Sequence, residues 1–248
     1  MDIARAASKN IAFSMAAAQS TSVPLEVVAN VQNHLRFVEA AAQHGVQWLV
    51  FPELSLTGYE LAAMPDLVLH ADHALLAPLR EAAQRTGMAI TVGAPVDSGS
   101  PLPFIGAITL RPDGQHSVYA KHHLHGSETR FATAGSVQVG LQAWAGQQIA
   151  SAICADTNYP SHAAQAAAAG ACVYAAGILT SANGYAAEAP LWASYAREHA
   201  MTVVIANHGG PSGCYLSAGR SGIWDSSGTC LASAKGNGDW LVIANPDR

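Results

Sequence analysis

The chain has 248 residues, half of them hydrophobic, which is enough to bury one complete core. No linker, repeat or low-complexity segment divides it, so we predict a single domain over residues 1–248. Charged residues make up only 12% and the net charge is −5, which excludes the strong positive field of nucleic-acid-binding and membrane-surface proteins. This low charge, with much Ala and Gly, favours a surface partly covered by a second subunit.

The first apolar run, residues 11–18, has two interpretations. Arg5 and Lys9 precede it, and the three alanines 16–18 could pass for the cleavage site of a signal peptide. We favour a buried β-strand, because the run is short and leads directly into a helical pattern. The Ala-rich residues 163–182 have too little bulk to span a membrane, so we expect no membrane partner.

The following elements alternate between helix and strand. Apolar spacing predicts helices over residues 27–42 and 75–85, followed by strands over 47–51 and 88–92. A hairpin is predicted for residues 104–110 and 117–121, because Asp113-Gly114 is a strong turn signal. A strand over 149–153, a helix over 161–169, a strand over 171–175, a helix over 190–200, a strand over 202–206 and hairpins within 223–243 complete the chain. This order predicts an α/β layered fold.

Three polar residues follow predicted strands directly: Glu53, Lys121 and Cys154. Taken singly, a Cys after an apolar strand is usually a small core residue, and a Glu or Lys is usually solvated. Strand ends at one edge of a sheet, however, can bring distant residues together. The three residues are therefore candidates for one catalytic site.

The segments around these residues resemble the nitrilase superfamily, the carbon–nitrogen hydrolases. Residues 51–59 read FPELSLTGY, residues 121–124 read KHHL with Glu128 downstream, and residues 154–156 read CAD before Tyr159 and Pro160. The likeness runs from about residue 11 to residue 243. It implies a four-layer αββα sandwich, a pairing of two copies into an αββα-αββα homodimer, and catalysis without a metal or cofactor.

The resemblance also assigns roles. Cys154 would be the nucleophile, Glu53 its base, and Lys121 the group that stabilises the developing negative charge together with the Ala155 N–H. Glu128 would orient Lys121 or the hydrolytic water. We expect further residues at the substrate pocket: Tyr59, Ala155, Asn158 and Asn183, with Trp192 and His208 as other possible lining residues.

Two positions depart from the family pattern. Asn158 stands where an Arg is frequent, and Ser161 stands where a Glu is common. These positions shape the acyl side of the pocket, so the departure leaves the substrate open more than the chemistry.

We therefore expect a cytoplasmic hydrolase of small amides that acts through a thioester intermediate. A nitrilase acting on nitriles is a narrower alternative, and a non-catalytic binding protein with the same fold is another. A metal site at His122, His123 and His125 is a third, although only the last two would share a face of a strand. The four cysteines show no metal-binding or disulfide spacing, which predicts a reduced protein in which Cys172, Cys214 and Cys230 serve packing.

Overall fold

The computed structural model describes residues 1–247, so residue 248, the last position of the expected single domain, lies outside the described residues. The α-helices are α1 (Val27–Gln43), α2 (Ala77–Thr86), α3 (Pro160–Ala168) and α4 (Ala182–His199). The strands are β1 (Asp2–Ser8), β2 (Met15–Gln19), β3 (Trp48–Val50), β4 (Ala89–Val96), β5 (Phe104–Leu110), β6 (His116–Ala120), β7 (Gly140–Trp144), β8 (Gln147–Ile153), β9 (Val173–Ile178), β10 (Thr202–Asn207), β11 (Gly222–Trp224), β12 (Cys230–Ser233) and β13 (Trp240–Pro246).

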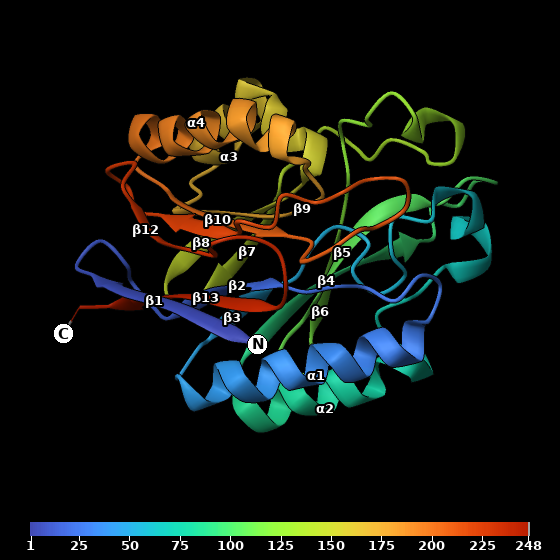
Figure 1. Cartoon of the computed structure of the whole chain (residues 1–248), viewed down its shortest axis with the longest axis horizontal. Coiled ribbons are helices and arrows are strands. Elements are labelled where there is room, and N and C mark those ends of the chain that lie inside the picture. The colour runs from blue at the N-terminus through green and yellow to red at the C-terminus, as the bar shows by residue number, and fades with distance from the viewer. Residues whose placement is uncertain (248) are drawn as a thin grey trace.

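The strands form two stacked sheets. A seven-stranded sheet has the order β1-β13-β2-β3-β4-β5-β6, and a six-stranded sheet has the order β12-β11-β10-β9-β8-β7. Helices α1 and α2 cover the outer face of the first sheet, and α3 and α4 cover the outer face of the second (Figure 1). The four-layer αββα sandwich predicted from the sequence is therefore confirmed.

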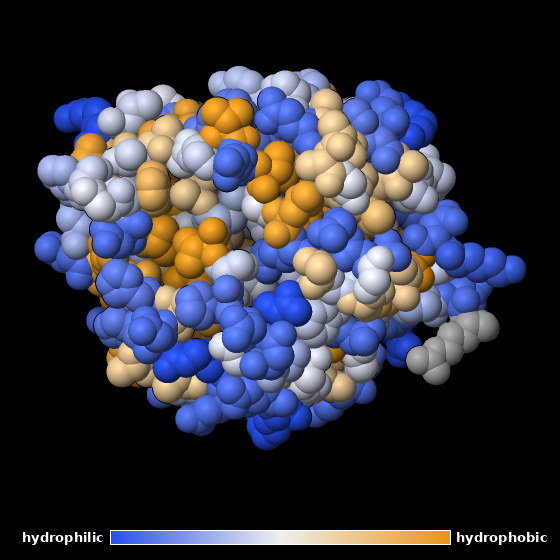
Figure 2. Space-filling model, turned by 180° about the vertical axis from the view of Figure 1, so that it is seen from behind, coloured by the Kyte–Doolittle hydropathy of each residue, from blue (hydrophilic) through white to orange (hydrophobic). Residues whose placement is uncertain are grey.

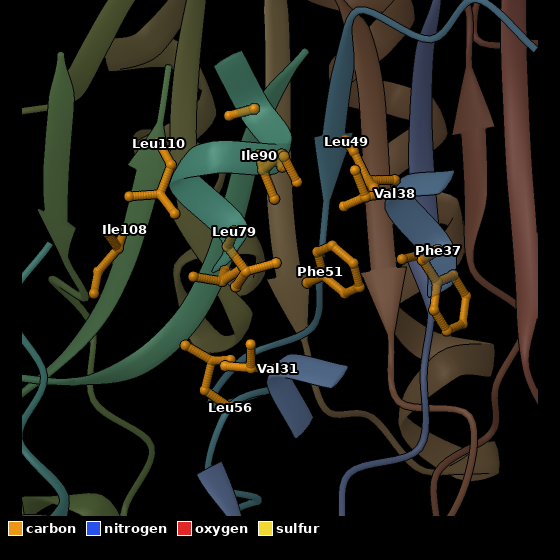
Figure 3. Close-up of a cluster of buried hydrophobic side chains, with 14 of the residues drawn as sticks. Val31, Phe37, Val38, Leu49, Phe51, Leu56, Leu79, Ile90, Ile108 and Leu110 are labelled. Carbon is orange, nitrogen blue, oxygen red and sulfur yellow. The ribbon is translucent and has the colours of Figure 1, made fainter. Parts of the chain in front are cut away.

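The apolar periodicity of the sequence explains the outer layers. Figure 3 shows side chains of α1 and α2 directed against those of β3, β4 and β5 in one buried cluster. The labelled members are Val31, Phe37, Val38, Leu49, Phe51, Leu56, Leu79, Ile90, Ile108 and Leu110. Because β2, β3 and β4 run parallel, each of their connections needs a crossover, and α1 and α2 supply these crossovers.

The N-terminal run contains a strand, but its position differs from the prediction. Residues 15–19 form β2, which is buried throughout and pairs with β13 on one side and β3 on the other. The preceding strand β1 was not predicted from the sequence. It reads DIARAAS, with little of the β-branched and aromatic content typical of strands, and it forms because it pairs in parallel with β13 at the sheet edge.

The C-terminal elements also differ from the predicted hairpins. Strands β11 and β12 do form an antiparallel pair, but β13 leaves their sheet and lies between β1 and β2 of the other one. The residues from Leu241 to Ala244 are fully buried, and a strand buried on both faces needs a central position in the sheet.

Helix α4 begins earlier than the predicted start at Pro190. Its first turn is capped by Ser181, whose Oγ accepts a hydrogen bond from the Gly184 N–H at 3.3 Å. Pro190 lies inside the helix, where it removes one backbone hydrogen bond. The helix continues past it because Trp192 and Tyr195 are buried against the six-stranded sheet.

The surface gives three further results. Cys172, Cys214 and Cys230 are exposed, so the prediction that they serve core packing was wrong. Within residues 1–247, no helix is both long and apolar enough to cross a membrane. Figure 2 shows apolar side chains gathered in patches among polar ones on one face of the molecule. Pairing with a second copy stays a prediction.

Two glycines, one from each sheet, make room for the segment that carries Glu53. A Cβ atom on Gly93 of β4 would lie 2.5 Å from the Pro52 carbonyl oxygen, and one on Gly177 of β9 would lie 2.4 Å from the Phe51 oxygen. Real Cβ atoms do not approach backbone so closely, and backbone cannot move aside as a flexible side chain can. The absence of side chains at these two positions therefore lets the segment pass between the sheets.

We predict that Gly177→Ala destabilises the protein by about 1–3 kcal/mol, because the added methyl group overpacks a rigid site. Urea unfolding measures this. Gly236→Ala is the matched control, since a Cβ there meets nothing within 4 Å. Equal unfolding midpoints and slopes for the two variants would contradict the close approach.

Candidate active site

The three predicted catalytic residues meet at one end of the sandwich, although they come from different sheets. Glu53 follows β3 and Lys121 follows β6 in the seven-stranded sheet, whereas Cys154 follows β8 in the six-stranded sheet. The Lys121 N–H donates to the Ile105 carbonyl at 2.9 Å, which extends the pairing of β5 and β6 by one residue. The sequence predicted that the three residues lie at the edge of one sheet, but they lie at the facing ends of two sheets.

Lys121 lies between two carboxylates. Its Nζ is 2.7 Å from Glu53 Oε1 and 2.6 Å from Glu128 Oε1, and all three side chains are fully buried. Burial alone would lower the pKa of Lys121, but the charges of Glu53, Cys154 and Glu128 raise it above its ordinary value. Lys121 is therefore held as a cation inside the protein.

The two carboxylates have different surroundings. Glu128 Oε1 also accepts a hydrogen bond from the Tyr59 hydroxyl at 2.6 Å, and its Oε2 accepts one from the His125 N–H at 2.7 Å. Glu53 Oε2, in contrast, is buried and accepts no hydrogen bond from the described residues. Because buried oxygens nearly always have a partner, this oxygen is available to receive a proton.

The protonation of Glu53 and Cys154 is linked. Burial raises the pKa of Glu53 to about 7, and the charge of Lys121 opposes that rise. Burial raises the pKa of the Cys154 thiol well above its ordinary value, and the Glu53 charge raises it further. The resting state is therefore a neutral thiol beside a carboxylate that titrates near neutrality.

Cys154 lies at a sharp turn between β8 and a short 3₁₀ helix, Cys154–Asn158. Its φ is +42°, a conformation that costs a non-glycine residue about 1–3 kcal/mol. The thiol contacts the Leu179 carbonyl oxygen at 3.5 Å. Such a turn at a strand end presents a side chain out of the sheet, as the nucleophile of a hydrolase requires.

Asp156 holds this turn in place. Its buried carboxylate accepts hydrogen bonds from the Ile153 N–H at 3.0 Å, the His123 N–H at 2.8 Å and the Tyr119 hydroxyl at 2.7 Å. One carboxylate thus joins the backbone just before Cys154 to the backbone two residues after Lys121. No pattern in the sequence singled out Asp156 for this role.

A cavity of about 180 Å³ opens at Cys154. Of the residues expected at the substrate pocket, Tyr59, Ala155 and Asn158 line it, whereas Asn183 is exposed on α4 and does not. Trp192 and His208 are fully buried elsewhere: the indole donates to Thr157 Oγ1, and His208 Nε2 lies 2.6 Å from the Glu53 carbonyl oxygen. The other lining residues are His125, Leu179, Thr180, Ser181, Gly184, Glu188 and Tyr215.

Sequence patterns missed these remaining residues because they come from loops and from a helix with no motif of their own. Ser181 is a residue type that commonly caps a helix, and a helix starting there could have been predicted from the sequence. Helical spacing would then have placed Gly184 and Glu188 on one face of α4.

The histidines of the proposed metal alternative have other contacts. His122 Nδ1 lies 3.1 Å from the Gly135 carbonyl oxygen, His123 Nδ1 lies 3.2 Å from Asp156 Oδ1, and His125 Nδ1 lies 3.3 Å from Ser127 Oγ. Among residues 1–247, no three His, Cys, Asp or Glu side chains are arranged to hold a metal ion. The geometry gives the metal-site alternative no support.

The structure combines an αββα sandwich, a cysteine at a sharp turn and a buried cluster of Glu53, Lys121 and Glu128. Together these features are those of a hydrolase with a cysteine nucleophile. The chain belongs to the carbon–nitrogen hydrolase family, whose model matches residues 14–248. This confirms the resemblance found in the sequence.

Solved structures of an amidase from Nesterenkonia sp. AN1 share the fold. The NitN amidase is 26% identical with a TM-score of 0.85, over 93% of this chain and 91% of that chain. A cysteine-to-serine variant, described as an amidase from the nitrilase superfamily, is 25% identical with a TM-score of 0.86, over 94% and 91%. A third form is 24% identical with a TM-score of 0.87, over 96% and 92%, and carries the acetamide moiety of fluoroacetamide covalently at its active-site cysteine.

We predict that Asp156→Ala lowers the free energy of unfolding by at least about 3 kcal/mol, because it leaves several buried donors without an acceptor at about 1–3 kcal/mol each. Thermal and urea unfolding measure this. Asp66→Ala, at an exposed position, is the control. The role of Asp156 would be refuted by equal stability of the two variants.

Proposed function

We propose that this protein hydrolyses small amides through a thioester on Cys154. One observation carries the proposal: the Cys154 thiol lines a cavity and lies within the field of a buried carboxylate, Glu53, and a buried ammonium group, Lys121. The similar Nesterenkonia amidase supports an amide substrate, since one of its variants is described in complex with butyramide.

The first half-reaction begins with a neutral thiol. Because the pKa of Cys154 is raised, Glu53 takes the Sγ proton as the sulfur attacks the amide carbon. The new S–C bond places negative charge on the carbonyl oxygen, which Lys121 and the Ala155 N–H stabilise. The C–N bond then breaks, Glu53 returns the proton to the leaving nitrogen, and ammonia or an amine departs from a thioester.

The second half-reaction uses the same groups. Glu53 takes a proton from water as its oxygen attacks the thioester carbon. The C–S bond breaks, the proton passes to sulfur, and the carboxylic acid leaves. Glu128 acts through Lys121: its two other hydrogen-bond donors, Tyr59 and His125, fix the carboxylate that holds the ammonium group.

We predict that Cys154→Ala lowers ammonia release from primary amides by at least about 10³-fold, because the nucleophile is removed. Cys172→Ala, at an exposed thiol, is the matched control and keeps wild-type activity. The assay panel contains amides and the corresponding nitriles, which separates an amidase from a nitrilase. Activity that persists in Cys154→Ala would refute the mechanism, and no turnover of either set would favour a binding protein.

The covalent step has a direct test. Mass spectrometry of wild-type protein quenched during turnover should show the mass of the acyl group on the peptide containing Cys154 and on none of the other three cysteine peptides. Acylation at another residue would contradict the assignment.

The pH dependence follows from Glu53. Below its pKa of about 7 the carboxyl group is protonated and cannot accept the thiol proton, so kcat/KM falls about tenfold per pH unit on the acid side. The Glu128 charge raises the pKa of Glu53, so Glu128→Gln should move this acid limb to lower pH. Glu81→Gln, at an exposed position, should leave it in place. An acid limb that stays fixed or rises in Glu128→Gln would contradict the linkage.

A further inference from the structure

The cavity at Cys154 has one carboxylate on its wall that the proposed mechanism does not use. Glu188 of α4 lines this cavity together with Thr180, Gly184 and Asn158. None of the described lining residues is Lys or Arg, and within residues 1–247 Glu188 forms no ion pair. His125 is the other ionisable side chain on the wall besides the tyrosines and the nucleophile.

The residues beside Glu188 on the cavity wall lie close to Cys154 in the structure or in the chain. Thr180 lines the cavity beside Glu188 and directly follows Leu179, whose carbonyl oxygen contacts the Cys154 thiol. Asn158, which also lines the cavity, ends the 3₁₀ helix that begins at Cys154. One small molecule can therefore reach both Cys154 and Glu188.

The wall is built rigidly around Glu188. The Thr180 backbone is fixed by Asn207, whose amide side chain accepts from its N–H at 3.0 Å and donates to its carbonyl at 3.2 Å. Gly184 leaves space for the Thr180 hydroxyl, since a Cβ there would lie 2.3 Å from Thr180 Oγ1.

The energetics of Glu188 favour a cationic partner. Burial raises its pKa, whereas the Thr180 and Asn158 donors and the His125 charge oppose that rise. A partly desolvated carboxylate is stabilised when an ammonium group replaces its lost water, and it repels a substrate carboxylate. The volume of about 180 Å³ lies below the roughly 300–1,000 Å³ typical of drug-sized ligand pockets, so the substrate is compact.

We propose that the substrates are short amides that carry an ammonium group a few bonds from the scissile carbonyl, with Glu188 as the residue that binds this group. The proposal rests on the amidase function proposed above and names its substrate class. In the bound state the carbonyl lies at Cys154 and Ala155, and the ammonium group lies at Glu188 between Thr180 and Asn158. Glu188 determines specificity and takes no part in bond breaking.

The test compares amides of equal size that differ in charge. The charged set is 3-aminopropanamide, 4-aminobutanamide and 5-aminopentanamide, and the neutral set is butanamide, pentanamide and hexanamide. At the chain length that fits, wild-type kcat/KM should be at least tenfold higher for the amino amide. In Glu188→Gln this ratio should fall at least tenfold, mainly through KM of the amino amide. Glu198→Gln, at an exposed position of the same helix, should keep the wild-type ratio.

Binding gives a readout that does not depend on turnover. Calorimetric titration of Cys154→Ala protein with the amino amides should show binding that is at least tenfold weaker when Glu188→Gln is added. If neutral amides are hydrolysed and amino amides are not, or if Glu188→Gln leaves the ratio unchanged, the substrate class is wrong and the amidase function stands. If amino amides bind through Glu188 but no amide is hydrolysed, the proposed function fails and the binding site stands.

Discussion

Lys121 is enclosed by Glu53 and Glu128 in a place that solvent does not reach. Transferring three charges from water to a protein interior costs several kcal/mol per ion, and only close pairing compensates for it. Glu128 follows Lys121 by seven residues, but Glu53 lies 68 residues before it, so the full cluster exists only when the end of the sandwich is assembled. Removing Lys121 would leave two carboxylates in the interior without a cation, so its ammonium group is a condition for the stability of this end of the fold.

The same cluster gives its two carboxylates different chemical properties. Glu128 accepts hydrogen bonds from Tyr59 and His125 in addition to Lys121, so its position is fixed. Glu53 has one oxygen on Lys121 and the other without a donor. A carboxylate with few donors in a buried site is more basic than one with many, which suits the proton transfers proposed for Glu53.

The substrate cavity continues this pattern of charge. Tyr59 and His125 on its wall donate to Glu128 of the buried cluster, and the wall adds Glu188 without a Lys or Arg among the described lining residues. Asn158 contributes to this balance, because it is a neutral residue on the same wall and opposes the rise in the pKa of Glu188. In the proposed function, the chemistry and the substrate preference are therefore set by different residues, and the preference can change while Glu53, Lys121 and Cys154 stay the same.

Much of the arrangement could be predicted from the sequence. Apolar periodicity and turn residues gave α1, α2 and the β5–β6 hairpin close to their observed bounds, and three motifs gave Glu53, Lys121 and Cys154 as one set. These features depend on local patterns, since a helical stripe, an Asp-Gly turn or a polar residue after a strand is written in consecutive residues. The family resemblance supplied the four-layer fold, which the structure confirms.

Other features depend on contacts between distant segments, and only the tertiary structure decided them. Strand β13 lies in the seven-stranded sheet because its buried residues need neighbours on both sides, and β1 forms because β13 is there to pair with it. Asp156 and Glu188 acquire their roles from partners that the chain brings to them, and Asn183 lies on the outer side of α4, away from the cavity. The sequence by itself determined which residues could react. The packing of two sheets determined which oxygen of Glu53 is free, what Lys121 is paired with and what the cavity presents to a substrate, because these properties arise from distances between residues far apart in the chain.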